Sequence, residues 1–179
     1  IMIITAGIYK GRKINVPKDK TVRPTLSKIR EGIFNTLFSL TDFENKSFLD
    51  VFAGSGIMGL EALSRGFEYA AALEKDKKTA KILKDNYISL KLAPNIHIGD
   101  SLKLLPKLNR QFDVIYLDPP YFSELYDNCL KVIEQNSLLK KQGILILEHI
   151  ADINLDGLNF KLIKQKKYSG KFVTFLTNL

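Results

Sequence analysis

The spacing of hydrophobic positions divides the chain into two parts. Between a cap at Thr25 or Ser27 and about Leu40, apolar residues return every three or four positions, which predicts an amphipathic helix. From residue 47 onward, short apolar runs alternate with longer amphipathic stretches. The short runs predict strands and the amphipathic stretches predict helices, so this part of the chain predicts a strand–helix repeat.

The strand–helix repeat predicts an α/β fold built on a mostly parallel sheet. Five strands are expected, at Ser47–Phe52, Tyr69–Leu73, Asn95–Ile98, Phe112–Leu117 and Gly143–Glu148. Two further runs, Phe160–Gln165 and Phe172–Thr177, predict a closing antiparallel hairpin. Because parallel strands need crossover connections, we expect helices on both faces of the sheet. Ligands of such folds bind at the carboxyl ends of the strands, so the loops that begin there are the candidate site.

The loop after the first of these strands is rich in glycine. Gly54, Gly56 and Gly59 match the G-x-G-x-x-G pattern, and Glu74 follows the last residue of the second strand. That pattern is typical of dinucleotide-binding proteins, so a nicotinamide-dependent dehydrogenase is one interpretation.

Three acids indicate a different cofactor. Asp50, Glu74 and Asp100 stand in order at the ends of the first three strands. A carboxylate at Asp50 repels a pyrophosphate but attracts a cation, such as the amino group of a methionine moiety. Glu74 can accept hydrogen bonds from both hydroxyls of a ribose, and Asp100 can accept one from an adenine amine. This series favours S-adenosylmethionine, a cationic nucleoside without phosphate.

The fourth strand ends in Asp118-Pro119-Pro120-Tyr121. Two prolines stop the sheet and fix a rigid turn, from which an acid and an aromatic side chain project. Such a turn suits a planar ring that carries an amine. The carboxylate or a backbone carbonyl accepts from the amine, and Tyr121 stacks on the ring. We therefore expect the methyl acceptor to bind at this turn.

Positive charge is concentrated at the two ends of the chain. The net charge is +8 over 179 residues, and residues 1–30 hold eight basic side chains against one acid. Residues 157–179 hold five lysines and no acid. Within the first segment, 2–9 and 12–16 flank a Lys-Gly turn and predict a small hairpin. Basic ends of this kind indicate a polyanionic partner, for which nucleic acid is the favoured interpretation.

The remaining composition indicates a cytoplasmic location. No apolar run is long enough to span a bilayer, and no signal-peptide pattern is present. The single Cys129 cannot form an internal disulfide, which fits a reducing compartment. Neither His97 nor His149 belongs to a cluster of metal ligands, so no metal is expected.

Taken together, these motifs resemble the RsmD family, the bacterial 16S rRNA guanine-N2 methyltransferases. The glycine loop, the acids and the Asp-Pro-Pro-Tyr turn resemble class I methyltransferases that act on exocyclic amines. Nearer the amino end, the segments that resemble the family specifically are Ile4-Thr-Ala-Gly7, Lys10-Gly-Arg-Lys13, Arg23-Pro-Thr25, Arg30-Glu31 and Phe34-Asn35. The resemblance implies one methyltransferase domain over 1–179, with a Rossmann-like seven-stranded sheet and a basic arm at 1–24 for RNA contact.

The resemblance also implies an activity and a set of site residues. The family methylates the N2 amine of guanine 966 in small-subunit rRNA. We expect a monomer that uses S-adenosylmethionine, needs no metal and acts on 16S rRNA, with an assembled small-subunit particle as one form of the substrate. The implied catalytic residues are Asp118, Pro119, Pro120 and Tyr121. The implied cofactor residues are Thr25, Asp50, Phe52, Ala53, Gly54, Ser55, Gly56, Glu74, Lys75, Asp100 and Ser101. The implied RNA-binding residues are Lys10, Arg12, Lys13, Arg23, Lys28 and Arg30.

Three alternatives stay open at this point. An adenine-N6 methyltransferase acting on DNA or rRNA shares the chemistry of the Asp-Pro-Pro-Tyr turn. A non-catalytic RNA-binding factor for ribosome assembly shares the basic ends but does not need the acids at the strand ends. The nicotinamide dehydrogenase shares the glycine pattern, and a binding assay with each cofactor separates it from the others.

Overall fold

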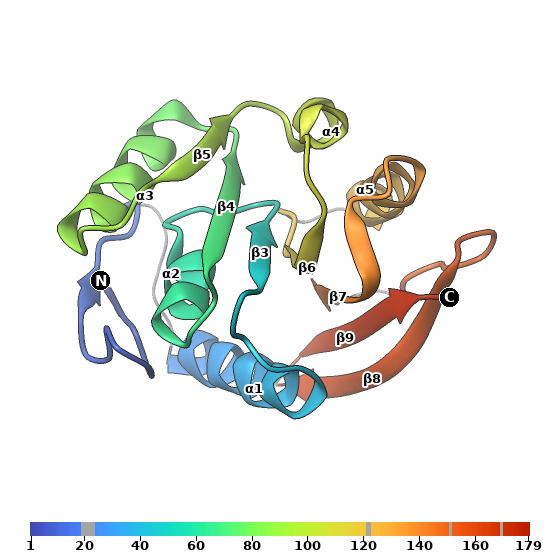
Figure 1. Ribbon diagram of the computed structural model, residues 1–179, viewed down its shortest axis with the longest axis horizontal. Coiled ribbons are helices and arrows are strands. Elements are labelled where there is room, and N and C mark those ends of the chain that lie inside the picture. Colours follow the sequence, from blue (N-terminus) through green and yellow to red (C-terminus); the bar gives the residue numbers. More distant parts are fainter. Residues whose placement is uncertain (19–23, 121–122, 151, 169) are drawn as a thin grey trace.

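Seven strands pair into a single twisted sheet at the centre of the molecule (Figure 1). The computed structural model describes residues 1–18, 24–120, 123–150, 152–168 and 170–179. The strands are β3 (Ser47–Asp50), β4 (Tyr69–Glu74), β5 (Asn95–Ile98), β6 (Phe112–Leu117), β7 (Leu139–His149), β8 (Phe160–Tyr168) and β9 (Lys171–Asn178). Their order is β5-β4-β3-β6-β7-β9-β8, and β9 runs antiparallel to both of its neighbours. The predicted α/β fold with a closing hairpin is confirmed.

Helices cover both faces of the sheet (Figure 1). The helices are α1 (Pro24–Leu40), α2 (Ile57–Ser64), α3 (Lys77–Ser89), α4 (Ser101–Leu104), the 3-10 turn η1 (Leu105–Lys107) and α5 (Ser123–Gln135). The first three share one apolar core with the sheet, and α5 and η1 share the other. Successive strand residues point to opposite faces, so Val114 and Tyr116 join the first core while Ile115 and Leu117 join the second. Among the described residues, no helix is long and apolar enough to cross a membrane.

The amino-terminal hairpin is shorter than the sequence predicts. In the described part of the arm, the paired strands are limited to β1 (Met2–Ile3) and β2 (Lys13–Ile14). Beyond them the chain folds against the end of α2, where the Ile8 amide donates to the Ser64 carbonyl at 2.9 Å. Gly7 makes this approach possible, because a Cβ at that position would lie 1.8 Å from the Ser64 carbonyl oxygen. The hairpin is therefore packed on the domain.

Element boundaries differ from the prediction mainly in the second half of the sheet. Strand β7 begins at Leu139, because Leu139 pairs with Phe112 before an irregularity in the register. Helix α3 is capped by Asp76, which accepts from the Thr79 amide at 2.7 Å. The helix ends at Ser89, and Lys91 just beyond it has a left-handed φ of 59°.

Candidate active site

The strand ends bring together carboxylates on the sheet face that α1 covers. Register pairs Asp50 with Tyr116 on β6, and Leu117 with Leu147 on β7. Since residues two apart on a strand share a face, Asp50, Asp118 and Glu148 all project on the same side as Tyr116. Glu74 ends the neighbouring strand β4. The site therefore lies across four adjacent parallel strands.

Asp50 is the buried centre of this cluster. Its side chain is 1% exposed, and its Oδ1 accepts from the Phe52 amide at 3.3 Å. Burial raises the pKa of the Asp50 carboxyl to about 8, and the nearby carboxylates of Asp118 and Glu74 add to the effect. A buried carboxylate needs a cationic partner to ionise at neutral pH, so this position suits a ligand that carries an ammonium group.

Glu74 is held in place by two backbone amides. Its Oε2 accepts from the Gly54 amide at 2.8 Å, and its Oε1 accepts from the Asp76 amide at 2.9 Å. Each carboxylate oxygen can accept a second hydrogen bond. The fixed carboxylate therefore presents two acceptor positions, as required for a pair of vicinal hydroxyls.

The glycine loop makes a tight turn between β3 and α2. Gly54 and Gly56 have left-handed φ values of 55° and 82°, a region that glycine adopts without steric cost. A Cβ at Gly56 would lie 2.8 Å from Leu83 Cγ. Ala53 and Ser55 are buried within the turn, and Phe52 is half-buried. Glycine at position 56 therefore allows the loop to pack closely against α3.

The third strand end carries Asp100 and its neighbours. Asp100 caps α4 by accepting from the Lys103 amide at 3.3 Å, and its Oδ2 lies 3.7 Å from Lys75 Nζ. Ser101 is buried, and its hydroxyl donates to the Val51 carbonyl at 2.7 Å. That hydrogen bond ties the third strand end to the glycine loop, so the Ser101 hydroxyl has a structural role.

The Asp-Pro-Pro turn follows β6 directly, as the sequence predicts. Asp118 is 37% exposed, Pro119 is buried and Pro120 is exposed. Asp118 Oδ1 lies 3.5 Å from Lys171 Nζ. The acid at this turn is therefore open to a ligand on one side and close to a cation on the other.

Three of the predicted site residues cannot be placed within the site. Tyr121 and Arg23 lie outside the described residues. Thr25 belongs to α1 by its backbone, and its side chain is outside the described part of the structure. The roles given to these three residues stay predictions from the sequence.

Three residues that the sequence analysis did not single out complete this part of the site. Glu148 is buried at the end of β7, where its Oε1 accepts from the Tyr116 hydroxyl and its Oε2 lies 3.2 Å from Lys171 Nζ. Glu148 could have been found from the sequence, because it is an acid at the end of an apolar run, as Asp50 is. No comparable local signal marks Lys171 or Tyr116.

Of the predicted RNA-binding residues that the structure describes, four are exposed and one is buried. Lys10, Arg12, Lys13 and Lys28 are exposed, and Arg12 also donates to the Ser89 carbonyl at 3.1 Å. The prediction for Arg30 is wrong. Its side chain is 3% exposed and its Nε lies 3.1 Å from Glu61 Oε2, so it is a partner of a buried acid.

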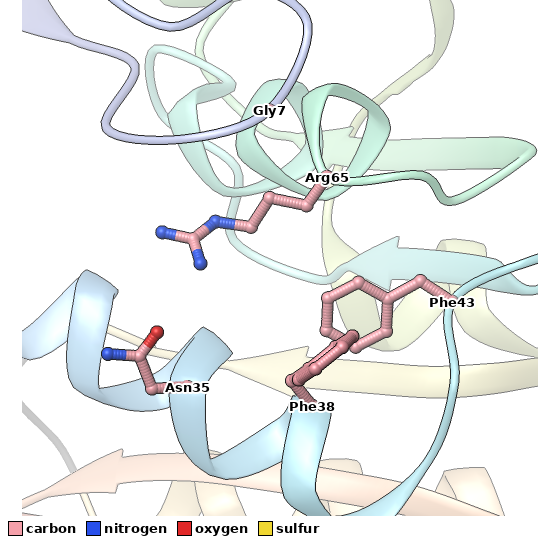
Figure 2. Close-up of a pocket in the computed structure, with 5 residues that line it drawn as sticks. All are labelled: Gly7, Asn35, Phe38, Phe43 and Arg65. Atoms are coloured by element: carbon pink, nitrogen blue, oxygen red, sulfur yellow. The ribbon is translucent and has the colours of Figure 1, made fainter.

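Glu61 is the centre of a buried ionic cluster beneath the arm. Its Oε1 also accepts from Arg65 Nε at 2.9 Å and from the Thr5 hydroxyl at 2.6 Å. A hollow of about 440 Å³ lies beside Arg65. Figure 2 shows the Arg65 guanidinium at this hollow, with Asn35 below it and the rings of Phe38 and Phe43 to one side. Arg65 follows α2 and Phe43 precedes β3, so this hollow lies at the amino ends of the strands. We assign the active site to the opposite edge, where the acids converge.

The two histidines have different surroundings. His97 is exposed on β5, and His149 is buried with its Nε2 at 2.7 Å from the Thr174 hydroxyl. Within the described ranges, no group of three or more His, Cys, Asp or Glu side chains has a geometry suited to a metal ion.

The fold and the strand-end acids define the class of protein. The doubly wound sheet has the strand order of a Rossmann-like methyltransferase. The glycine turn and the Asp-Pro-Pro turn fit the same class. The chain belongs to the family described as Conserved hypothetical protein 95, which matches residues 2–177 and is the RsmD family.

Individual relatives cover most of the chain. Ribosomal RNA small subunit methyltransferase D of Haemophilus influenzae is 35% identical over 169 residues, which are 91% of this chain and 86% of the relative. The Escherichia coli (strain K12) protein of the same name is 31% identical over 167 residues, which are 91% of this chain and 83% of the relative.

Solved structures agree with this assignment. The Escherichia coli protein yhhF has a TM-score of 0.85 at 26% identity, covering 99% of this chain and 97% of its own. A Thermus thermophilus protein, TTHA0928, has a TM-score of 0.82 at 28% identity, with full coverage of both chains. SMU.776, whose structure is complexed with S-adenosylhomocysteine, has a TM-score of 0.64 at 12% identity and shares the fold alone.

Proposed function

We propose that this protein transfers the methyl group of S-adenosylmethionine to the N2 amine of a guanine in small-subunit ribosomal RNA, with guanine 966 as the target. The observation that carries the proposal is the placement of Asp50 and Asp118 on one sheet face, at the ends of adjacent strands. One acid suits the cationic cofactor and the other suits an amine acceptor. The names of the relatives support ribosomal RNA as the substrate.

The cofactor is S-adenosylmethionine, and its functional groups match the donors and acceptors of the first three strand ends. Asp50 binds the α-amino group, whose positive charge offsets the burial of the carboxylate. Glu74 accepts from the ribose hydroxyls, and Asp100 accepts from the adenine amine. Lys75, which follows Glu74, and Phe52, which follows the first strand, are assigned to the same cofactor site. The resemblance to the family adds Thr25.

At the Asp-Pro-Pro turn, this protein positions a weak nucleophile. The lone pair of the guanine N2 is delocalised into the ring, so the amine must be held close to the methyl group and in line with the departing sulfur. Positioning of this kind can lower a barrier by roughly 7–11 kcal/mol. Asp118 and the Pro119 carbonyl accept the amine hydrogens, and Tyr121 stacks on the base. The released proton passes to Asp118 or to water.

The RNA contacts the exposed basic residues of the amino-terminal arm, residues 1–24, together with Lys28. Phosphate contacts from Lys10, Arg12 and Lys13 orient the substrate without reading its sequence. Arg23 belongs to this proposed set on the basis of the sequence alone. A paired guanine does not expose its N2 to the methyl group, so the base is flipped out or already unpaired when it enters the site.

The first test is mass analysis of methylated nucleosides after incubation with S-adenosylmethionine and either rRNA or genomic DNA. N2-methylguanosine in 16S rRNA is the expected product, and mapping by mass locates the nucleotide. N6-methyladenine in either substrate would replace the guanine proposal with the adenine alternative. Absence of any methylated product from an active cofactor-binding preparation would favour the assembly-factor alternative.

The Asp118→Ala variant tests the role of the turn. We expect kcat to fall by about 100-fold or more, because the amine loses an acceptor in the transition state. S-adenosylmethionine affinity should stay within about twofold of the wild type, since Asp118 is assigned to the acceptor base. Single-turnover methylation beside calorimetric cofactor titration measures both quantities. Normal turnover by Asp118→Ala would remove this turn from the mechanism.

A further inference from the structure

Lys171 lies at the junction between the closing hairpin and the active-site edge of the sheet. It is the first residue of β9, which pairs antiparallel with β7 so that His149 faces Phe172. Because the two strands run in opposite directions, the start of β9 lies beside the end of β7. A residue far from the methyltransferase motifs in sequence therefore reaches the Asp-Pro-Pro turn.

The Lys171 ammonium bridges two carboxylates. Its Nζ lies 3.2 Å from Glu148 Oε2 and 3.5 Å from Asp118 Oδ1. The lysine side chain is 29% exposed and Glu148 is 6% exposed, so solvent screens the Lys171–Glu148 pair only in part. The second oxygen of Glu148 accepts from the buried Tyr116 hydroxyl. The result is a continuous chain of contacts from Tyr116 through Glu148 and Lys171 to Asp118.

The carboxylates around Lys171 explain why a cation is stable at this position. Asp118 and Glu148 occupy the ends of adjacent parallel strands and face the same side of the sheet, beside buried Asp50. Ionised carboxylates at the ends of adjacent strands repel one another. Partial burial by itself lowers the pKa of Lys171, but the carboxylates of Asp118 and Glu148 outweigh it and raise that pKa above its ordinary value. The lysine is therefore charged at neutral pH.

We propose that Lys171 is a positioning residue for methyl transfer, holding the Asp118 carboxylate toward the acceptor amine through its shared ion pair with Glu148. This inference rests on the proposed function of Asp118. Glu148 is fixed by Tyr116 and by burial, so it serves as the rigid end of the bridge. Lys171 transmits that rigidity to Asp118, which is the more exposed of the two acids. The closing hairpin thus contributes to the active site.

The test is the Lys171→Met variant, which keeps an unbranched side chain, one heavy atom shorter than lysine, and removes the charge. A catalytic group displaced by about 1 Å can lose on the order of 100-fold in rate. We therefore expect kcat to fall by about 10- to 100-fold, with the KM for RNA and the affinity for S-adenosylmethionine both within about twofold of wild type. Lys171→Arg should recover most of the lost kcat. Adding Lys171→Met to Asp118→Ala should cause no further loss, because the lysine acts through the aspartate.

The matched control is Lys140→Met. Lys140 makes the same kind of pair with Asp113 at 2.8 Å, at the opposite end of the same strand β6. This control should keep the wild-type kcat. A raised KM for RNA with an unchanged kcat in Lys171→Met would overturn the inference and make the lysine a phosphate contact. So would a wild-type kcat in Lys171→Met.

A stability measurement separates failure of this inference from failure of the proposed function. Denaturation of Lys171→Met, Glu148→Gln and the double variant forms a cycle that reports the ion pair without reference to activity. If the cycle shows coupling but the wild-type protein methylates no RNA, the ion pair exists and the proposed function is overturned. The positioning role of Lys171 in methyl transfer is then overturned with it. Additive effects in an enzyme that does methylate RNA would overturn the bridge alone.

Discussion

Asp50, the proposed partner of the cofactor's ammonium group, carries a cost in the free protein. Its carboxyl is almost completely buried, and a hydrogen bond from the Phe52 amide offsets that burial in part. The pKa of about 8 means that the group is mostly neutral at pH 7 in the absence of a cation. An ammonium group that enters the site favours the ionised form, so cofactor binding near pH 7 should release a proton.

The Asp50→Asn variant tests this account through the pH dependence of stability. The unfolded pKa of an aspartate is about 3.9, and the folded value is about 8. The native state therefore binds more protons in this window, and the contribution of Asp50 to stability is complete below about pH 4 and lost as the pH rises to about 8. Urea denaturation from pH 5 to 8 should show a steeper loss of stability in the wild type than in Asp50→Asn, which cannot ionise.

The same variant should bind S-adenosylmethionine at least about 10-fold more weakly, because the ammonium group loses its charged partner. Asp156→Asn, at an exposed aspartate, is the control and should behave as the wild type in both measurements. Parallel loss of stability in the wild type and Asp50→Asn would mean that Asp50 is not the neutral buried carboxyl described above.

At the scale of elements, the closing hairpin approaches helix α1 closely at one glycine. Gly32 in α1 faces the Tyr168 side chain, and a Cβ at Gly32 would lie 2.2 Å from the Tyr168 hydroxyl and 2.9 Å from Cζ. Tyr168 pairs with Lys171 across the hairpin. Glycine in the middle of a helix costs up to about 1 kcal/mol relative to alanine. Its presence here allows the hairpin to reach the active-site edge.

The Gly32→Ala variant tests whether this contact positions the hairpin. Alanine favours the helix, but its methyl group displaces Tyr168 and with it the start of β9. We expect kcat to fall about 10-fold while cofactor affinity is retained, because the bridge from Lys171 to Asp118 lengthens. The double variant Gly32→Ala/Tyr168→Leu, which removes the clash, should regain part of the activity. An unchanged kcat in Gly32→Ala would show that the hairpin adjusts without moving Lys171.

Sequence reasoning located the parts of the site that are local in the chain. Asp50, Glu74 and Asp118 each end an apolar run, so the strand pattern alone places them at one edge of a parallel sheet. Lys171 could not be found in this way, because its position depends on β9 pairing with β7, which no local pattern specifies. The error at Arg30 has a similar cause. Its burial depends on Glu61, a partner 31 positions away on another helix.

At the scale of the whole molecule, the exposed cations of the arm and the carboxylates of the candidate active site lie in different places. The exposed cations of the arm, Lys10, Arg12 and Lys13, lie on the hairpin that packs against the end of α2. The acids lie at the carboxyl edge of the sheet. The buried Glu61 cluster joins the arm to both α1 and α2, since Arg30 of α1 also donates to the Ile3 carbonyl at 2.6 Å. The arm is therefore fixed relative to α1 and α2, which pack on the sheet.

Replacing Lys10, Arg12 and Lys13 with alanine should weaken RNA binding and flatten its dependence on salt. Removing one phosphate-binding cation lowers the slope of log affinity against log salt by about 0.7–0.9, so a decrease of roughly 2 is expected for the three. Filter binding over a salt series measures the slope, and cofactor titration should show no change. The control replaces Lys107, Lys131 and Lys141, which are exposed elsewhere on the molecule. Equal slopes in the two triple variants would mean that the arm is not the RNA-binding surface.

Strand β8 ends the sheet, and among the described strands none pairs with its outer side. Its exposed apolar residues, Leu162 and Ile163, are interspersed with lysines, among them Lys161 and Lys164. Unpaired edges invite pairing with a second chain, and lysines on the edge oppose it by repulsion. Salt screens that repulsion. A high ionic strength that releases RNA therefore also removes this protection against self-association. The RNA-free protein should be least resistant to aggregation in the high-salt buffers that remove the substrate.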